Sequence, residues 1–404
     1  MSDAGPAKDH VYDVAIVGGL GHVGLPLGLA LADAGCRVCL YDLPSPKSDL
    51  VAQGRMPFIE YEAEPILQRV LNRTLFITHA PADLAHAAIV IVAIGTPVDE
   101  YLNPKLRALL ELFAELGPHL SPRQTIIIRS TVYPGTCAQI ARKLEELAPG
   151  PWRLAYCPER IVQGHALREL RELPQIVAGL NEEAAGVASA LFGRIASHVI
   201  RVEMAEAELA KLFSNAWRYV QFAMTNQFYM IADSLGADYN RVRHAMVEGY
   251  GRAANLPTAG FAAGPCLLKD TLQLAAFDSS KFLLGHAAML VNEGLPNYLV
   301  ERLSQRFDLS TTRVGILGMT FKADIDDTRD SLSYKLGKIL RFHGAQVLYS
   351  DEYAQDPTFI GKEALVERSE VVIVGVPHAA YRELPVPARV HVVDLWGILP
   401  KPAT

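Results

Sequence analysis

The sequence predicts an α/β fold in which a long central helix joins two doubly wound parallel-sheet domains. Short apolar runs alternate with helical stretches over residues 10–201, a long helical pattern follows, and the alternation restarts near residue 313. A chain of 404 residues is also long enough for two or three domains. We therefore expect domains at residues 10–201, 202–303 and 304–404.

The first α/β region begins with a short buried strand. Val11 to Val17 is an apolar run that ends in glycines, which is typical of a parallel strand covered on both faces. A helix over Leu25 to Ala34 and a second strand over Arg37 to Tyr41 come next. Further strands are expected at Ile89–Ile94, Thr125–Ile128 and Gln175–Ala178.

The middle region has a different pattern. From Val202 to Leu235 apolar residues recur near helical spacing and no strand pattern interrupts them. Further helices are expected up to Leu303. This region therefore predicts a helical connector between two α/β domains.

A second α/β region starts at Arg313 and repeats the plan of the first: strand, glycine turn, helix, strand, acidic residue. Its turn reads Gly318-Met319-Thr320-Phe321-Lys322 and lacks a dinucleotide motif. We therefore expect this domain to hold a different ligand, or to hold it differently. Its strands are expected at Val314–Leu317, Gln346–Ser350, Val371–Val376 and Val390–Asp394.

Composition excludes several classes of protein. A formal net charge of −6 argues against a nucleic-acid partner, although a small phosphate site remains compatible with it. The chain has no apolar stretch of about 18 residues and no signal-peptide pattern, so we expect no membrane span. Five cysteines, of which Cys36 and Cys39 are the closest but lie in a strand-like run with no matching ligand pair elsewhere, argue against a metal site and favour a reducing cytoplasm. They are Cys36, Cys39, Cys137, Cys157 and Cys266.

A glycine-rich motif lies between the first strand and the first helix. It reads Gly19-Leu20-Gly21-His22-Val23-Gly24, a GxGxxG pattern in the context of a Rossmann-like dinucleotide site. Its glycines allow a tight turn, close approach of a pyrophosphate, and close packing of helix on strand. Asp42 ends the second strand, where a carboxylate accepts hydrogen bonds from ribose hydroxyls and repels a 2′-phosphate. The motif therefore predicts NAD rather than NADP; a tight turn without a ligand is the alternative.

A small-residue loop, Gly260 to Asp270, contains Cys266 just before an expected helix and close to Lys269. A cysteine near a helix start and a cation can act as a nucleophile. From the local pattern alone, a small buried hydrophobic residue is the more common role of a lone cysteine.

Several motifs follow one another along the chain. They are the GxGxxG motif, Ser130–Thr136, Pro158-Glu159-Arg160 with Gly164, Lys211–Asn215, Gly264–Asp270, Phe321-Lys322 and Asp327–Ser331. In this order, and over nearly its whole length, the chain resembles the UDP-glucose/GDP-mannose dehydrogenase family.

The resemblance implies three parts: an NAD domain, a helical dimerisation region, and a C-terminal domain that holds the nucleotide of the substrate. It also implies two successive NAD-dependent oxidations of the C6 alcohol of a nucleotide sugar. Cys266 would add to the aldehyde, the second oxidation would give a thioester, and water would release the uronic acid. Covalent capture explains the need for a cysteine, since a reactive aldehyde could otherwise escape. UDP-glucose is the substrate that we expect first.

The resemblance assigns further catalytic roles. Lys211 and Asn215 are four residues apart and share a helix face, where a cation and an amide can stabilise a negatively charged oxygen. The alternative for this pair is a solvated helix face. Glu159 and Asp270 both match family carboxylates, and either could act as general base. Thr131 lies on a turn that in the family approaches the nicotinamide and the catalytic water.

Other residues match ligand contacts. Lys322 and Gly264 correspond to the substrate site, and Thr96 and Arg329 to the cofactor site; His22 and Val23 lie within the dinucleotide motif. Arg252 matches an arginine that a neighbouring subunit inserts, so a homodimer or larger homo-oligomer is expected; an exposed loop arginine is the alternative. The resemblance also places three catalytic residues at the substrate: Glu159, Lys211 and Asn215.

The cysteine loop departs from the family pattern. Many relatives have Gly-Gly-Ser-Cys or Gly-Gly-His-Cys, whereas Pro265 here removes a backbone donor before the thiol. Lys269-Asp270 resembles the UDP-glucose and GDP-mannose enzymes, while Asn292–Pro296 resembles the amino-sugar branch. UDP-N-acetylhexosamine, GDP-mannose and dTDP-glucose therefore remain alternative substrates.

Two other functions remain open. A two-electron β-hydroxyacid dehydrogenase shares an NAD domain and a long helix with lysine and asparagine, but needs neither Cys266 nor a second α/β domain. A non-catalytic nucleotide-sugar-binding protein would need none of the catalytic residues.

Overall fold

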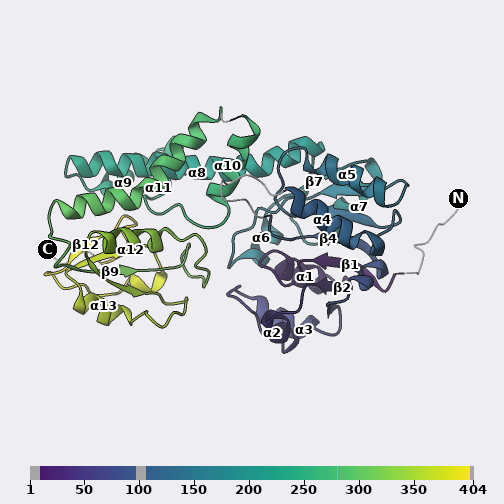
Figure 1. Cartoon of the computed structure of the whole chain (residues 1–404), viewed down its shortest axis with the longest axis horizontal. Helices are drawn as coiled ribbons and strands as arrows, with labels where there is room; N and C mark the ends of the chain where they lie inside the picture. Colours follow the sequence, from purple (N-terminus) through teal and green to yellow (C-terminus); the bar gives the residue numbers. More distant parts are fainter. Residues whose placement is uncertain (1–9, 97–105, 280, 401–404) are drawn as a thin grey trace. The chain divides into compact units, whose positions relative to one another are not determined.

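The computed structural model describes residues 10–96, 106–279 and 281–400 (Figure 1). The chain forms two compact units, residues 1–213 and 214–404. The division falls inside the 31-residue helix α8 (Met204–Ser234). The three domains expected at residues 10–201, 202–303 and 304–404 remain a prediction.

The first unit is built on an eight-stranded sheet with the order β3-β2-β1-β4-β5-β6-β7-β8. Every expected strand of this region is present, which confirms the doubly wound α/β fold. The strands are β1 (Tyr12–Val17), β2 (Val38–Tyr41), β3 (Leu75–Thr78), β4 (Ala87–Val92), β5 (Thr125–Ile128), β6 (Arg153–Tyr156), β7 (Gln175–Gly179) and β8 (Val199–Arg201).

Alternating side chains of these strands supply two separate cores. Val14 and Ile16 point to the face covered by α1, α3, α6 and α7, whereas Ala15 and Val17 point to the face covered by α4 and α5. Because both faces of the sheet are buried, the sequences of these strands are continuous hydrophobic runs. The helices are α1 (Gly24–Asp33), α2 (Pro46–Ala52), α3 (Ala63–Val70), α4 (Leu106–Leu116), α5 (Thr136–Leu147), α6 (Ala166–Glu172) and α7 (Glu182–Phe192).

One strand pair differs from the expected parallel arrangement. β6 and β7 are antiparallel, with Tyr156 opposite Ala178. The connection contains only the seven-residue helix α6. The hydrogen bond between Gln163 and His22 shows that this connection lies at the carboxyl edge of the sheet, beside the glycine turn after β1. The chain therefore re-enters the sheet from the edge that it has just left.

The second unit combines a small sheet with a layer of helices. Its four strands are parallel in the order β10-β9-β11-β12, and α12 and α13 lie on opposite faces (Figure 1). Leu295 and Leu299 of α11 share one core with Leu336 of α12 and Ile316 of β9. The elements are α9 (Tyr239–Val247), α10 (Leu267–Phe277), α11 (Leu283–Ser304), β9 (Arg313–Leu317), α12 (Leu332–Phe342), β10 (Gln346–Ser350), α13 (Lys362–Arg368), β11 (Val371–Val374) and β12 (His391–Val393).

The helices are too short or too polar to cross a lipid bilayer, as far as the described residues extend. Even the long helix α8 carries charged side chains along its length.

Candidate active site

The glycine turn of the first unit connects β1 to α1. Gly18 has the positive φ of 79°, so the left-handed residue precedes the GxGxxG motif by one position. A Cβ on Gly19 would lie 2.7 Å from Cβ of Leu40, and a Cβ on Gly24 would lie 2.2 Å from the Gly18 carbonyl oxygen. These two glycines are therefore required by close packing of the turn against β2 and against itself.

Gly21 has a different environment. A Cβ there would meet the Gly18 carbonyl oxygen at 3.4 Å, an ordinary van der Waals contact. The protein's own packing does not demand this glycine, which fits close approach of a ligand. Asp42 is half-buried at the end of β2, and its carboxylate accepts a hydrogen bond from the Leu20 N–H at 2.8 Å. An open turn beside a partly exposed carboxylate fits the diphosphate and ribose of a dinucleotide.

Three other predicted cofactor residues lie in this unit. Val23 caps the N-terminus of α1, and the ring of His22 packs on Phe58 with centroids 4.0 Å apart. Thr96 follows β4, the strand next to β1, and is half-buried. All three lie in segments that follow neighbouring parallel strands, where ligands of such sheets bind.

The turn that contains Thr131 is held by a residue that the sequence reading missed. Glu208 of α8 is buried, and its carboxylate accepts hydrogen bonds from the N–H groups of Gly135 at 2.6 Å and Cys137 at 2.9 Å. These N–H groups belong to the first turn of α5, which has no side-chain cap of its own. Glu208 therefore anchors the Thr131 turn to the helix that carries Lys211.

Glu159 lies in an ion pair with Arg129, a second residue that the sequence reading missed. The Arg129 side chain is completely buried; it donates to Glu159, to Gln175 Oε1 at 2.6 Å and to the Cys157 carbonyl oxygen at 3.0 Å. The other Glu159 oxygen accepts from the N–H groups of Arg160 and Ile161 at 2.6 and 2.8 Å. Both carboxylate oxygens of Glu159 are therefore engaged.

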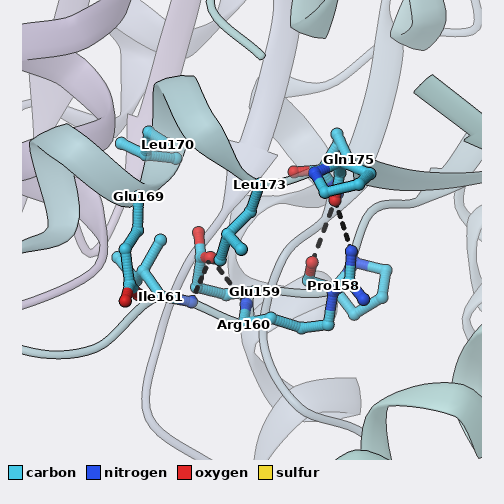
Figure 2. A pocket seen from close by; sticks show the side chains of 9 residues that line it. Pro158, Glu159, Arg160, Ile161, Glu169, Leu170, Leu173 and Gln175 are labelled. Atoms are coloured by element: carbon cyan, nitrogen blue, oxygen red, sulfur yellow. Dashed lines mark hydrogen bonds between the residues drawn. The ribbon is translucent and has the colours of Figure 1, made fainter. Parts of the chain in front are cut away.

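Figure 2 shows this carboxylate turned back toward its own loop. Beside it is a small hollow, lined by residues 158–161, 169–170 and 173–175. No signal in the sequence links Arg129 to Glu159, because they lie 30 residues apart on different elements.

Lys211 and Asn215 both lie on α8 and both are buried, 8% and 6% exposed. The solvated helix face is therefore the wrong alternative for this pair. A buried lysine and a buried amide on one helix face need polar partners.

Asn215 has such a partner in the cysteine helix. Its Nδ2 donates to Asp270 Oδ2 at 2.6 Å, and the Asp270 side chain is only 1% exposed. The other oxygen, Oδ1, lies 3.7 Å from Lys269 Nζ and has no hydrogen-bond partner among the described residues. A buried carboxylate oxygen that accepts no hydrogen bond from the described residues is suited to accept one from a water molecule or a substrate hydroxyl.

Cys266 is the N-cap residue of α10, and it alone is exposed among the five cysteines, all of which the structure describes. Asp270 follows one turn later, with its N–H bonded to the Cys266 carbonyl oxygen at 2.8 Å. Burial raises the pKa of the thiols of Cys39 and Cys157 to about 12. Burial also raises the pKa of Cys36 and of Cys137, which leaves Cys266 as the thiol placed for reaction.

The loop after β9 packs against this cysteine loop. The Gly264 N–H donates to the Asp330 carbonyl oxygen at 3.3 Å, and a Cβ on Gly264 would lie 2.6 Å from the Phe321 ring. Arg329 pairs with Asp327, and this hydrogen bond raises the Arg329 pKa. Lys322 is half-buried in the same loop. Arg329 and Lys322 thus belong to the loop that packs beside the cysteine.

An asparagine anchors the cysteine loop from the other side. Asn226 of α8 exchanges two hydrogen bonds with the backbone of Gly260, at 2.9 and 3.0 Å, as a neighbouring strand would. Its Nδ2 also donates to Asn292 of α11 at 2.9 Å. Arg252 lies outside this network, exposed and 5.9 Å from the centre of the Tyr250 ring.

The predicted site residues therefore fall into two groups. The first unit holds Asp42, the glycine turn, Thr96, Thr131, Glu159 and Lys211, and the second holds Asn215, Gly264, Cys266, Asp270, Lys322 and Arg329. No cluster of three or more His, Cys, Asp or Glu side chains suited to a metal ion occurs in the part of the chain that the structure describes.

Comparison with known proteins gives three matches along the chain. Residues 12–216 match the UDP-glucose/GDP-mannose dehydrogenase family, NAD binding domain; residues 205–293 match its central domain, and residues 315–401 its UDP binding domain. The first match alone covers half of the chain.

Individual relatives agree. A UDP-N-acetyl-D-mannosamine dehydrogenase from Pyrococcus horikoshii is 27% identical over 91% of this chain and 90% of its own. An NDP-N-acetyl-D-galactosaminuronic acid dehydrogenase from Ralstonia nicotianae is 26% identical over 94% of both chains. The solved structure of a UDP-glucose dehydrogenase from Pyrobaculum islandicum superposes with a TM-score of 0.87 at 27% identity, over 97% of this chain and 96% of its own.

These matches confirm the resemblance, and NAD is the cofactor that the glycine turn and Asp42 fit. The chain belongs to the UDP-glucose/GDP-mannose dehydrogenase family, whose members are NAD-dependent nucleotide-sugar dehydrogenases.

Proposed function

We propose that the protein oxidises the C6 alcohol of a nucleotide sugar to the carboxylate, through a thioester on Cys266. The observation that carries this proposal is the exposed Cys266 thiol at the start of α10, one helical turn from the buried Asp270–Asn215 pair. A two-electron hydroxyacid dehydrogenase would need neither the thiol nor this pair.

Different residues would serve the two oxidations and the hydrolysis. The glycine turn and Asp42 would hold NAD, and two molecules of NAD, bound one after the other, would supply the hydride acceptors for the two oxidations. The first oxidation converts the C6 alcohol to an aldehyde, and the Cys266 thiolate adds to the aldehyde carbon to give a thiohemiacetal. The second oxidation removes a hydride from this carbon and leaves a thioester. Attack by water then breaks the C–S bond, which releases the acid and returns the thiolate. Lys211 and Asn215 carry an ammonium and an amide suited to stabilise the oxygen that becomes negative in these steps.

Asp270 is the better placed of the two carboxylates to act as general base. A base needs a lone pair that can receive a proton from water. At Glu159, Arg129 and the N–H groups of Arg160 and Ile161 already occupy three of the four carboxylate lone pairs. Asp270 Oδ1 accepts none from the described residues. We therefore assign activation of the hydrolytic water to Asp270, and a positioning role to Glu159.

For the substrate, we propose a UDP-N-acetylhexosamine ahead of the UDP-glucose that the sequence led us to expect. Two of the relatives above are named for N-acetylated sugars, and residues 292–296 resemble the amino-sugar branch. UDP-glucose is the second candidate, because Lys269-Asp270 and the Pyrobaculum islandicum structure favour it. GDP-mannose and dTDP-glucose complete the panel to be tested.

We also propose that two copies pair along α8, in the reducing cytoplasm where Cys266 stays a thiol. Trp217, Met224 and Ile231 recur every seven residues and are 64%, 51% and 53% exposed, which makes an apolar stripe on one side of the helix. A second copy would cover this stripe and could bring its Arg252 to the substrate site. Light scattering of Met224→Glu tests the pairing: the variant should be monomeric, and an unchanged oligomer would exclude this stripe.

The thioester is tested with Cys266→Ser and the four nucleotide sugars. The intact protein should release two NADH per molecule of one sugar, and the variant should bind the same ligands without sustained formation of acid. A buried cysteine, Cys157→Ser, is the matched control for loss of a thiol. Undiminished acid formation by Cys266→Ser would exclude the covalent mechanism.

A further inference from the structure

A buried histidine lies behind the loop that packs on the cysteine segment. His378 follows β11, and its side chain is completely buried. Its Nε2 lies 3.1 Å from Asp351 Oδ2 and 3.3 Å from Thr320 Oγ1. Its Nδ1 accepts a hydrogen bond from the Asp324 N–H at 2.9 Å. Nothing in the proposed chemistry uses this histidine.

These partners define the tautomer. A backbone N–H can only donate, so Nδ1 must be the unprotonated nitrogen. Nε2 then carries the proton and donates it to Asp351, with Thr320 Oγ1 as a second acceptor. The Thr320 hydroxyl is free to donate onward to the Lys322 carbonyl oxygen at 2.9 Å. The donor and the acceptor of each hydrogen bond in this chain are therefore assigned.

The segment that His378 holds is strained. Asp324 and Asp330 have positive φ angles of 59° and 52°, which are unfavourable for residues with a side chain. Such residues persist only where surrounding bonds hold them. The Asp324 N–H is held by His378, and its carboxylate by the Ala379 N–H at 2.9 Å and the Tyr353 hydroxyl at 3.1 Å.

The same segment reaches the nucleophile. Phe321 and Asp330 contact Gly264, two residues before Cys266. The Ser331 hydroxyl donates to the Thr320 carbonyl oxygen at 3.0 Å, which ties the two ends of the loop together. His378 is therefore connected through Thr320 and Asp324 to the loop that presents Lys322 and Phe321 beside the cysteine segment.

We propose that His378 is a positioning residue: through its Nδ1 acceptor and the Asp324 N–H, it holds the loop of residues 319–331 in the shape that binds the nucleotide sugar and packs on the Cys266 segment. The part concerning nucleotide-sugar binding rests on the proposed function. The part concerning the contact with the Cys266 segment rests on the observed packing alone.

Two substitutions separate the nitrogens of His378. In His378→Asn the amide oxygen can replace Nδ1 as acceptor, whereas His378→Gln keeps a donor near Nε2 and loses the Nδ1 acceptor. The exposed His343 lies in the same unit, and His343→Gln is the matched control. We expect His378→Gln to raise the KM for the nucleotide sugar on the order of tenfold, with little change in the KM for NAD. His378→Asn should stay close to the intact protein.

Two readouts need no turnover. Iodoacetamide should alkylate Cys266 on the order of threefold faster in full-length His378→Gln than in His378→Asn or His343→Gln, because the loop is looser. In ¹⁵N-histidine spectra, the resonance missing from His378→Gln should belong to a ring protonated at Nε2. If turnover fails altogether, the proposed function fails, and these two measurements still decide the role of His378.

Three results would overturn the proposal. One is a ring protonated at Nδ1. Another is equal alkylation of Cys266 in all variants. The third is a loss in both His378 variants that affects kcat and both KM values alike, since that pattern indicates a purely structural residue.

Discussion

The two units contain the same strand–turn–helix arrangement, and they use its acidic residue in opposite ways. Gly18 and Gly318 both have positive φ, and their N–H groups bond to Tyr41 at 3.0 Å and Ser350 at 2.8 Å, the last residues of the neighbouring strands. The residue that follows each of these strands in the chain is an aspartate that accepts a hydrogen bond from an N–H of the turn. Asp42 accepts from Leu20, and Asp351 accepts from Met319.

The surroundings of the two carboxylates differ. Asp42 is half-buried and has capacity left for a ligand. The side chain of Asp351 is completely buried and accepts from His378 and from the N–H groups of Tyr353 and Ala354. In the second turn, the carboxylate of Asp351 therefore stabilises the protein's own loops. A repeated backbone therefore does not imply a repeated ligand, because the carboxylate of Asp351 is already bonded to His378 and to backbone N–H groups.

The largest expected effect concerns stability. Asp351→Ala would leave several buried N–H donors without an acceptor, each costing about 1–3 kcal/mol, so the free energy of unfolding should fall by about 3 kcal/mol or more. Asp42→Ala, the matched change in the first turn, should cost under about 1 kcal/mol. Urea unfolding of both variants measures the difference. Equal losses would show that the two aspartates have the same role.

The next effect is a pH dependence that only the second turn should show. Burial raises the Asp351 pKa, but hydrogen bonds from His378 and from backbone N–H groups outweigh it and lower the pKa from 3.8 to about 2. A lowered pKa stabilises the fold above the unfolded value, and this contribution is lost as the pH falls toward the folded value. The stability gap between the intact protein and Asp351→Asn should therefore narrow by about 2 kcal/mol between pH 5 and pH 2. A gap that stays constant in urea titrations would contradict this account.

A smaller effect is expected on the cofactor. Asp42→Ala removes hydrogen bonds from a carboxylate to the ribose, worth about 1.5–3 kcal/mol, so the Kd for NAD should rise at least about tenfold. The preference for NAD over NADP should shrink as well, because the repulsion of a 2′-phosphate is lost. Fluorescence titration with both cofactors measures this. An unchanged NAD affinity would mean that Asp42 serves only the Leu20 N–H.

The sequence predicts features that depend on local order along the chain. Five strands of the first unit, the four strands of the second, the long helix, the glycine motif and the Cys266 loop are predicted within a few residues of their observed bounds, whereas β3, β6 and β8 are not predicted. The antiparallel pairing of β6 and β7 is not predicted either, because it depends on the path of the connection through α6, which returns to the sheet at the edge where β6 ends. Arg129 with Glu159, and His378 with Asp351, join residues 30 and 27 positions apart. Such pairs form only in the folded chain, so a single sequence gives no sign of them.

The smallest expected effect is that of Gly21→Ala, which tests whether this glycine is needed for ligand binding or for the packing of the first turn. Gly21→Ala adds a Cβ that meets only an ordinary contact at 3.4 Å within the protein, so stability should change little. Binding of NAD should weaken about fivefold, or about 1 kcal/mol, because the methyl group points to where the diphosphate approaches. Gly24→Ala is the contrasting control: its Cβ would lie 2.2 Å from the Gly18 carbonyl oxygen, so the fold itself should suffer. If Gly21→Ala instead lost stability and kept its NAD affinity, the glycine would belong to the packing of the turn, and the contrast with the second turn would rest on Asp42 alone.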